Sequence, residues 1–241
     1  MSGKKIIFVG GNARSGTTAL QNLLNCHPSV FVLRERYLAE VKAGQLHPSM
    51  FDKSAVLAEE AGIPLPLLQS GVDLGARYDQ ALYVGDKVPA VSKGFDAIDR
   101  VFPDAVIVFI LRNPFSVAAS YQQRFDRGTW KRDAVRGIQD WNRSTRSALR
   151  RVQTGGRLIV VPYEEVFQYG DKSRQLFAAL GLDPSELDQD AFDVLVDQSQ
   201  RLETKSETRS EELLAYVARN AAFQPYRQLL SEHSLYAEQP N

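Results

Sequence analysis

Short apolar runs alternate with longer amphipathic stretches along most of the chain. Buried strands are predicted by runs rich in β-branched and aromatic residues, which lie at 6–9, 29–33, 105–111 and 158–161. Helices are predicted by apolar residues at helical spacing, in the stretches 15–27, 114–125, 138–152, 175–180, 190–196 and 211–230. Strands that alternate with helices are typical of an α/β fold with a mainly parallel sheet.

The segment between the second predicted strand and residue 80 is less regular. Residues 55–61 have a helical pattern, and several prolines and glycines in 38–80 predict loops and short helices around it. This part of the chain therefore predicts no large element and carries no motif that we can connect with a particular chemistry.

The first predicted strand leads into a glycine-containing loop and a helix. Gly10 and Gly11 end the apolar run, and Gly11 and Gly16 have the G-x-x-x-x-G spacing of a phosphate-binding loop. Glycines let the backbone approach a ligand, and the free N–H groups at a helix start attract an anion. Thr17 and Thr18 add hydroxyl donors. A turn that only caps the helix is the simpler alternative.

One position of this loop differs from a nucleotide-hydrolysing P-loop. Thr17 stands where such a loop has the lysine that reaches the β- and γ-phosphates. Arg14 is the only cation in the loop. The loop is therefore suited to an anion that carries less charge than ATP with Mg²⁺.

The composition fits one soluble domain: 44% of the residues are hydrophobic and 24% are charged. Lys+Arg and Asp+Glu both number 29, which gives no electrostatic case for nucleic acid or a membrane as partner. Cys26 is the only cysteine, so an intrachain disulfide and a thiolate metal cluster are excluded, and we expect it to pack on the apolar side of the first helix. No apolar run approaches the ~20 residues of a membrane span, and the first strand begins almost at once, so we expect no signal peptide and a cytoplasmic location.

The loop sequence at 12–20, NARSGTTAL, resembles the 5′-phosphosulfate loop of sulfotransferases. These enzymes transfer a sulfuryl group from 3′-phosphoadenosine 5′-phosphosulfate (PAPS) to an acceptor. The RSGTT variant is more similar to the tyrosylprotein, bacterial and carbohydrate branches than to the cytosolic small-phenol branch, which has lysine in this loop. The donor-binding residues that the resemblance implies here are Arg14, Ser15, Gly16, Thr17 and Thr18.

Glu35 follows the second predicted strand and is flanked by Arg34 and Arg36. Ligands of open α/β sheets bind at the carboxyl ends of the strands, so this carboxylate could act as a base for an acceptor hydroxyl, and we expect the two arginines to keep it ionised. The segment HPSV at 27–30 resembles the family's H-P-x-V, whose spacing to the catalytic glutamate points to Glu35 rather than Glu40. A solvated charge cluster is the alternative.

The segment GDKVP at 85–89 resembles the G-D-K-x-P segment of many sulfotransferases. The resemblance implies that Lys87 lies beside the transferred group and supplies the cation that the loop lacks. Sulfuryl transfer resembles phosphoryl transfer in its loose transition state, whose charge an ammonium and backbone N–H groups can stabilise without a metal. Lys93 is a weaker candidate for this role, and a surface lysine at a turn is the alternative for Lys87.

A second motif follows the longest apolar run. Asn113 and Pro114 have the pattern of an N-cap and a first helical residue, and Ser120 and Arg124 share one face of the helix that follows. Together with Arg112 at the strand end, these side chains would form a cradle for a phosphate dianion.

The run at 102–120, FPDAVIVFILRNPFSVAAS, resembles the 3′-phosphate-binding segment of sulfotransferases, with Arg112 and Ser120 at the family's spacing. Arg124 matches a further arginine of the tyrosylprotein branch. ATP has no 3′-phosphate, so a dedicated site here favours 3′-phosphoadenosine nucleotides over nucleoside triphosphates. An ordinary strand–helix junction with an exposed arginine is the alternative.

The last third of the chain carries weaker signals. The segment PYEEV at 162–166 resembles the family's Y-E-D/E-L/V, which implies that Tyr163 lies by the adenine; a buried tyrosine at the sheet edge is the alternative. The closing motif of the cytosolic branch is not found, and the polar segment 205–209 is a candidate closing loop. The predicted helix at 138–152 is rich in arginines that we expect to form a solvated face: Arg143, Arg146, Arg150 and Arg151.

The resemblance as a whole predicts a three-layer α/β fold of the P-loop nucleoside-kinase-like type, as one sulfotransferase domain over 1–241 with a core at about 4–181 and a helical part at about 182–241. Glu35 is the expected base and Lys87 the expected electrostatic catalyst of in-line transfer from PAPS to a hydroxyl, with no metal. The acceptor is left open among carbohydrate, lipid, peptide and small metabolite, and a homodimer is one option for the assembly. A small-molecule kinase or NTPase, which Thr17 disfavours, and a non-catalytic nucleotide-binding module are the alternatives.

Overall fold

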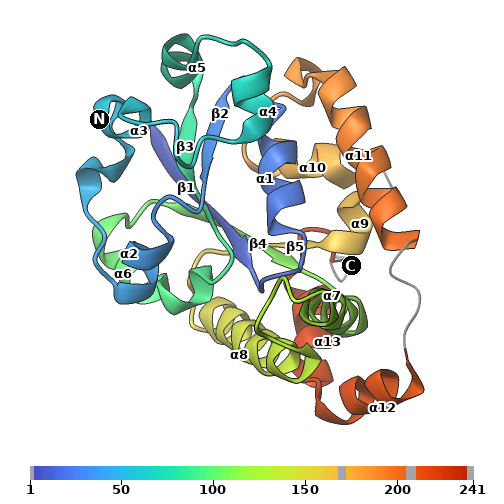
Figure 1. The fold of residues 1–241 in the computed structure, drawn as a ribbon. Coiled ribbons are helices and arrows are strands. Elements are labelled where there is room, and N and C mark those ends of the chain that lie inside the picture. The colour runs from blue at the N-terminus through green and yellow to red at the C-terminus, as the bar shows by residue number, and fades with distance from the viewer. Residues whose placement is uncertain (1–2, 168–171, 205–209, 238–241) are drawn as a thin grey trace.

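The computed structural model describes residues 3–167, 172–204 and 210–237. Within them, a five-stranded sheet in the order β2-β3-β1-β4-β5 forms the centre, and every pair of neighbouring strands is parallel (Figure 1). The strands are β1 (Lys5–Gly11), β2 (Val30–Arg34), β3 (Tyr83–Val88), β4 (Val106–Leu111) and β5 (Ile159–Pro162). The predicted α/β fold with a mainly parallel sheet is confirmed.

Helices cover both faces of the sheet (Figure 1). One face is covered by α1 (Thr17–Asn25), α9 (Tyr163–Phe167), α10 (Lys172–Ala179) and α11 (Gln189–Thr204). The other face is covered by α2 (Leu38–Ala43), α3 (Lys53–Leu57), α4 (Leu65–Gln69), α5 (Leu74–Gln80), α6 (Phe95–Val101), α8 (Ala134–Gln153) and α13 (Phe223–Glu232), with the 3₁₀ turns η1 (Pro48–Phe51) and η2 (Val91–Lys93). The remaining elements are α7 (Pro114–Asp126), α12 (Glu211–Asn220) and η3 (Pro184–Glu186). None of the helices in the described part of the chain is long and apolar enough to cross a bilayer.

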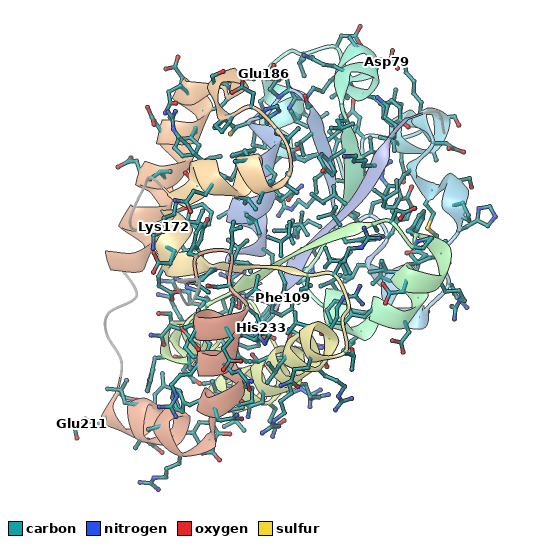
Figure 2. The ribbon with its side chains drawn as sticks, turned by 180° about the vertical axis from the view of Figure 1, so that it is seen from behind. Asp79, Phe109, Lys172, Glu186, Glu211 and His233 are labelled. Carbon is teal, nitrogen blue, oxygen red and sulfur yellow. The ribbon has the colours of Figure 1, made fainter. Side chains whose placement is uncertain are left out.

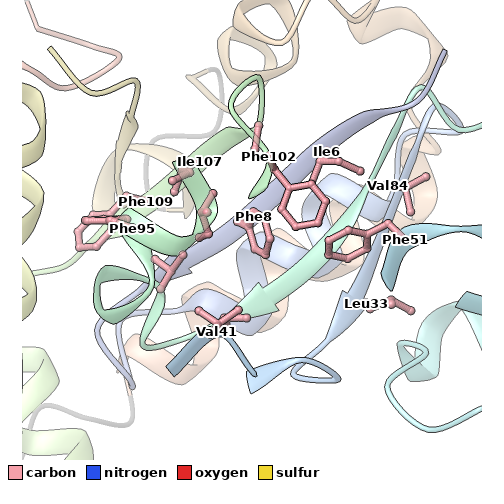
Figure 3. Packing of buried hydrophobic residues seen from close by; sticks show 14 of the residues in the cluster. Ile6, Phe8, Leu33, Val41, Phe51, Val84, Phe95, Phe102, Ile107 and Phe109 are labelled. Carbon is pink, nitrogen blue, oxygen red and sulfur yellow. The ribbon is translucent and has the colours of Figure 1, made fainter. Parts of the chain in front are cut away.

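The two faces of the sheet have separate hydrophobic cores because successive side chains of a strand point to opposite sides. On one side, Phe8 of β1 packs its ring 5.6 Å from that of Phe51 and 5.9 Å from that of Phe102 (Figure 3). On the other side, Ile7 and Val9 pack with α1 and α10. Phe109 lies in the interior, whereas Asp79, Glu186 and Glu211 lie at the periphery (Figure 2). These cores fix the strands that carry the site.

The strand β3 is the element that the apolar pattern does not predict. Gly85, Asp86 and Lys87 interrupt the pattern, yet all six residues of the strand are buried. Gly85 is required because a Cβ there would lie 1.6 Å from the carbonyl oxygen of Ile7, so only glycine lets β3 pair closely with β1. Burial of the two charged side chains depends on contacts that are made outside the strand, described below.

Two predicted helices differ from the structure. The stretch 55–61 is helical only in α3, which ends at Leu57. The stretch 211–230 is two helices, α12 and α13, because Ala221 has an extended conformation (φ −74°, ψ 140°) that ends α12. The asparagine cap of α7 is confirmed, since Asn113 accepts the N–H of Phe115 at 2.8 Å through its side chain.

The strand order places the carboxyl ends of the strands on one edge. After β1 the chain runs to β2 and β3 on one side, and then crosses to β4 and β5 on the other. In the register, Gly10 of β1 lies beside Val88 of β3, and Gly11 lies beside Ile110 of β4. The loops after β1 and β4 therefore leave the sheet at a topological switch point, where ligands of open α/β sheets bind.

Candidate active site

The loop between β1 and α1 has two residues in left-handed backbone conformations, Arg14 (φ 70°) and Gly16 (φ 91°). Gly16 is the N-cap of α1. A Cβ at Gly16 would lie 2.4 and 2.5 Å from two ring carbons of Tyr163, so glycine is required by both the conformation and the packing. The predicted phosphate-binding loop is thus held between the helix that it starts and the residue predicted to contact adenine.

Ser15 is buried in this loop, and its hydroxyl has no hydrogen-bond partner among the described residues. A buried unpaired hydroxyl is costly unless a ligand completes its bonding. The first turn of α1 also leaves backbone N–H groups without helical partners. Both features fit an anion at this loop.

Arg112 at the end of β4 connects the second motif to the loop. Its Nη1 donates to the carbonyl oxygen of Arg14 at 3.2 Å, and its guanidinium lies 4.1 Å from the centre of the Tyr163 ring. Its own carbonyl oxygen accepts the indole N–H of Trp141 at 3.0 Å. The structure therefore brings three residues that are far apart in sequence into one cluster.

The side chain of Arg14 points from the loop to the second motif. Its Nε donates to the hydroxyl of Ser120 at 3.0 Å. Burial, followed by the positive charges of Arg124 and Arg112, lowers the pKa of Arg14 to about 10. The positive charges of these guanidinium groups lie close together in a partly buried place, where their repulsion is unfavourable. A multivalent anion bound there would offset this repulsion. The sequence assigns Arg14 to the loop alone, but its side chain belongs to both motifs.

Glu35 and Lys87 are paired at the neighbouring edge of the sheet. Lys87 is fully buried on β3, and its Nζ donates to Oε1 of Glu35, whose side chain is 40% exposed. Burial lowers the pKa of Lys87, whereas the hydrogen bond and the charge of Glu35 raise it. Lys87 is therefore not a surface lysine at a turn, and Glu35 is not a freely solvated carboxylate.

The expected role of the flanking arginines is wrong for Arg36. Its guanidinium turns away from Glu35 and donates to four backbone carbonyl oxygens, those of Ala55, Val56, Glu59 and Ala61, at 2.6 to 3.1 Å. Arg36 thus completes the carboxyl end of α3 and the turn after it. The cation that contacts Glu35 comes from the neighbouring strand instead.

A cavity of about 590 Å³ joins the loop to Glu35. The predicted residues that line it are Arg14, Thr17, Thr18, Glu35 and Lys93. Six further charged or aromatic lining residues have no local sequence signal that could have identified them, because distant elements bring them here: Lys42, Tyr121, Trp130, Arg132, Asp140 and Arg143. The cavity has room for an acceptor next to Glu35.

The arginines of α8 do not form one solvated face. Arg143 lines the cavity and pairs with Asp140 at 3.0 Å. Arg151 is 9% exposed and makes a two-pronged ion pair with Asp99, with both contacts at 2.7 Å. Arg143, Arg146 and Arg150 are exposed as expected. The candidate closing loop at 205–209 lies outside the described residues.

This arrangement is that of a P-loop-like α/β protein. Its parallel sheet carries a glycine-containing loop after the first strand, an arginine cluster after β4, and a Glu–Lys pair at the ends of β2 and β3. The model of the sulfotransferase family matches residues 7–186, and the chain belongs to that family. The predicted family is thereby confirmed.

Relatives and solved structures agree with this membership. The chain is 24% identical to protein-tyrosine sulfotransferase 1 of Danio rerio over 69% of its length, and 31% identical to nodulation protein NoeE of Sinorhizobium fredii over 52% of its length. It spans 50% and 32% of those two proteins. The crystal structure of a sulfotransferase from Alicyclobacillus acidocaldarius has the same fold, with a TM-score of 0.56, 18% identity, and coverage of 98% of this chain and 97% of that chain.

Proposed function

We propose that this protein transfers a sulfuryl group from PAPS to the hydroxyl of an acceptor. The observation that carries the proposal is the cluster of Arg14, Arg112, Arg124 and Ser120 beside the loop. A 3′-phosphate dianion would balance the positive charge of this second place, which a nucleotide with only a 5′-phosphate chain would not reach.

The residues would divide the donor between them. The loop from Ser15 to Thr18 would hold its 5′ end through backbone N–H groups and hydroxyls, with the buried hydroxyl of Ser15 among the donors. Arg112, Ser120 and Arg124 would hold the 3′-phosphate, with Arg14 between the two sites. Tyr163, which packs on the loop and on Arg112, would lie against the adenine.

When bound, PAPS supplies the sulfuryl group. In the proposed transfer, a bond forms between the acceptor oxygen and sulfur while the bond from sulfur to the 5′-phosphate oxygen breaks. Glu35 takes the proton of the acceptor hydroxyl, and adenosine 3′,5′-bisphosphate leaves. Lys87 supplies a fixed positive charge beside Glu35 that stabilises negative charge developing on the leaving oxygen.

The acceptor would enter the cavity that Glu35 lines. One of the relatives bears the name protein-tyrosine sulfotransferase, and the acceptor group of a tyrosine is a hydroxyl. What we carry over is the reacting group, a hydroxyl, and not the identity of the molecule that bears it.

The first experiment tests the donor class. Calorimetric titration with adenosine 3′,5′-bisphosphate is set against titration with 5′-AMP and with ATP–Mg²⁺, on the wild-type protein and on Arg112→Ala. Arg146→Ala is the matched control, because Arg146 is an exposed arginine on α8. We expect the bisphosphate to bind best and Arg112→Ala alone to lose that preference. A preference for ATP–Mg²⁺ would overturn the proposal in favour of a kinase or NTPase.

The second experiment separates an enzyme from a binding module. Protein, PAPS and a mixture of phenols, sugars and tyrosine peptides are incubated, and sulfated products are identified by mass spectrometry. Glu35→Gln is expected to abolish product formation and to leave bisphosphate binding intact. Bisphosphate binding without product from any acceptor, and without an effect of Glu35→Gln, would favour a non-catalytic module.

A further inference from the structure

Asp86 is a carboxylate with no role in the transfer proposed above. It lies between Gly85 and Lys87 on β3, and its side chain is fully buried. Its strand neighbours in the sheet are Phe8 of β1 and Leu33 of β2, both apolar. A carboxylate in such surroundings costs stability unless its oxygens are well bonded, so its contacts indicate why it is there.

The carboxylate of Asp86 binds the backbone just after Glu35. Its Oδ2 accepts the N–H of Tyr37 at 2.8 Å, and its Oδ1 accepts the N–H of Arg36 at 3.4 Å. The N–H of Glu35 itself donates to the carbonyl oxygen of Lys87 at 3.0 Å. Three consecutive N–H groups are therefore tied to β3, two of them by one buried side chain.

These bonds hold a conformation that the chain would otherwise avoid. Glu35 has a φ of 57°, in the left-handed region that non-glycine residues rarely adopt. Such a conformation persists only where the surroundings impose it. The same left-handed turn aims the Glu35 carboxylate at the Nζ of Lys87 and into the cavity.

The electrostatics agree with a carboxylate kept for its position. Burial raises the pKa of Asp86 to about 7, although the N–H groups of Tyr37 and Arg36 and the charge of Lys87 lower it. The Tyr37 hydroxyl is close enough to feel the charge of Asp86, and the charges of Arg36 and Glu40 act on that hydroxyl. A buried carboxylate whose ionised form is disfavoured lowers the stability of the fold. Such groups are found mainly at functional sites.

We propose that Asp86 is a positioning residue: its carboxylate fixes the turn at 35–37 and thereby the direction of the Glu35 side chain. The proposal rests on Glu35 being the base of the proposed reaction. Lys87 holds the carboxylate of Glu35 from one side of the strand, while Asp86 holds the backbone that carries it. The two adjacent residues of β3 thus act on one glutamate through different atoms.

The test compares Asp86→Asn with Asp79→Asn. Asn keeps the shape of the side chain but has a single acceptor oxygen, so it cannot accept two N–H groups with separate oxygens. Asp79 is an exposed carboxylate on α5 whose partner is Lys53, at the periphery of the molecule (Figure 2). It therefore controls for the loss of one negative charge. The readouts are amide hydrogen exchange at Arg36 and Tyr37, the melting temperature, the affinity for adenosine 3′,5′-bisphosphate, and kcat for an acceptor found by mass spectrometry.

Asp86→Asn is expected to speed exchange at Arg36 and Tyr37 at least about 10-fold and to lower kcat about 10²-fold, the loss typical of a misplaced catalytic group. Bisphosphate affinity and melting temperature should not fall, and Asp79→Asn should change none of the four readouts. Unchanged exchange at the two amides would overturn the proposal, as would a fall of melting temperature and bisphosphate affinity together with kcat.

A measurement on the wild-type protein keeps the proposal testable if the variant does not fold. The Tyr37 amide proton shift and kcat are followed from pH 5.5 to 8.5, and both should change together as Asp86 loses its proton. A Tyr37 amide that does not titrate would overturn the proposal. Failure of the donor assignment would appear differently, as absent bisphosphate binding in the wild-type protein with the Tyr37 titration intact.

Discussion

Gly16 connects the fold to the donor site, and replacing it with alanine tests that connection. The residue has a φ of 91°, and an added Cβ would lie 2.4 Å from a ring carbon of Tyr163. The left-handed conformation costs alanine about 1–2 kcal/mol. The contact adds a packing cost of about 1–3 kcal/mol, because the Tyr163 ring must move and it is held by Arg112 and Phe167.

The two terms together predict that Gly16→Ala lowers the free energy of unfolding by about 3 kcal/mol, or the melting temperature by about 6–12 °C for a chain of this length. Gly128→Ala is the matched control. Gly128 also has a positive φ, of 66°, but a Cβ there meets no atom within 4 Å. It should therefore show only the conformational cost, about 1–2 kcal/mol.

Urea unfolding of both variants, with calorimetric titration of adenosine 3′,5′-bisphosphate, measures the two terms. Gly16→Ala should also weaken bisphosphate binding, because Tyr163 and the loop shift together, whereas Gly128→Ala should not. A double-mutant cycle with Tyr163→Ala should recover the packing cost as a coupling energy of about 1–3 kcal/mol. Equal destabilisation by the two glycine variants, or no coupling in the cycle, would refute the packing of Tyr163 on the loop.

Three further predictions concern buried ionisable groups. Lys87→Met should lower kcat by about 10²–10³-fold without lowering the melting temperature, since burial already disfavours the ammonium; a parallel fall in stability would contradict a catalytic role. Burial raises the pKa of the Cys26 thiol to about 12, so native protein should resist iodoacetamide at pH 8 and react only once urea unfolds it; rapid labelling of native protein would contradict this. The pKa of Asp86 is about 7 when folded against 3.8 unfolded, so the unfolded state loses this proton first as the pH rises. The stability of the wild type should therefore fall relative to Asp86→Asn between pH 4 and pH 7, by up to about 4 kcal/mol, as urea titrations at pH 4 and pH 8 would show.

The parts of the site that the sequence predicts are those with local signatures. Arg112 and Ser120 stand at a strand end and on the next helix, and a pattern of strand, N-cap and helix is enough to place them on one edge of the sheet. The structure brings predicted donor-binding residues together through contacts of Arg14, Arg112 and Tyr163. Their roles in binding and catalysis stay predictions.

The parts that the sequence does not predict depend on contacts between distant segments. The strand β3 is not predicted because Asp86 and Lys87 are polar. They can be buried because Asp86 accepts N–H groups of the turn at 35–37 and Lys87 pairs with the Glu35 carboxylate. The direction of Arg36 is not predicted for the same reason, since its carbonyl partners belong to the last turn of α3 and to the segment that follows it. Arg151 has the spacing of a solvated helix face, but its side chain is buried and pairs with Asp99 of α6, whose carboxylate is half exposed.

Arg14 and Glu35 are the non-glycine residues with positive φ in the described part of the chain, and both stand in the site. Glycine, and to a lesser degree asparagine, would relax the backbone at either position by about 1 kcal/mol. Selection of a variant library for thermal stability alone should therefore enrich glycine at positions 14 and 35, and it would remove the site while it improved the fold. The identity of these two side chains can be maintained only by selection for what they do, so a thermostable form should be engineered with both positions held fixed.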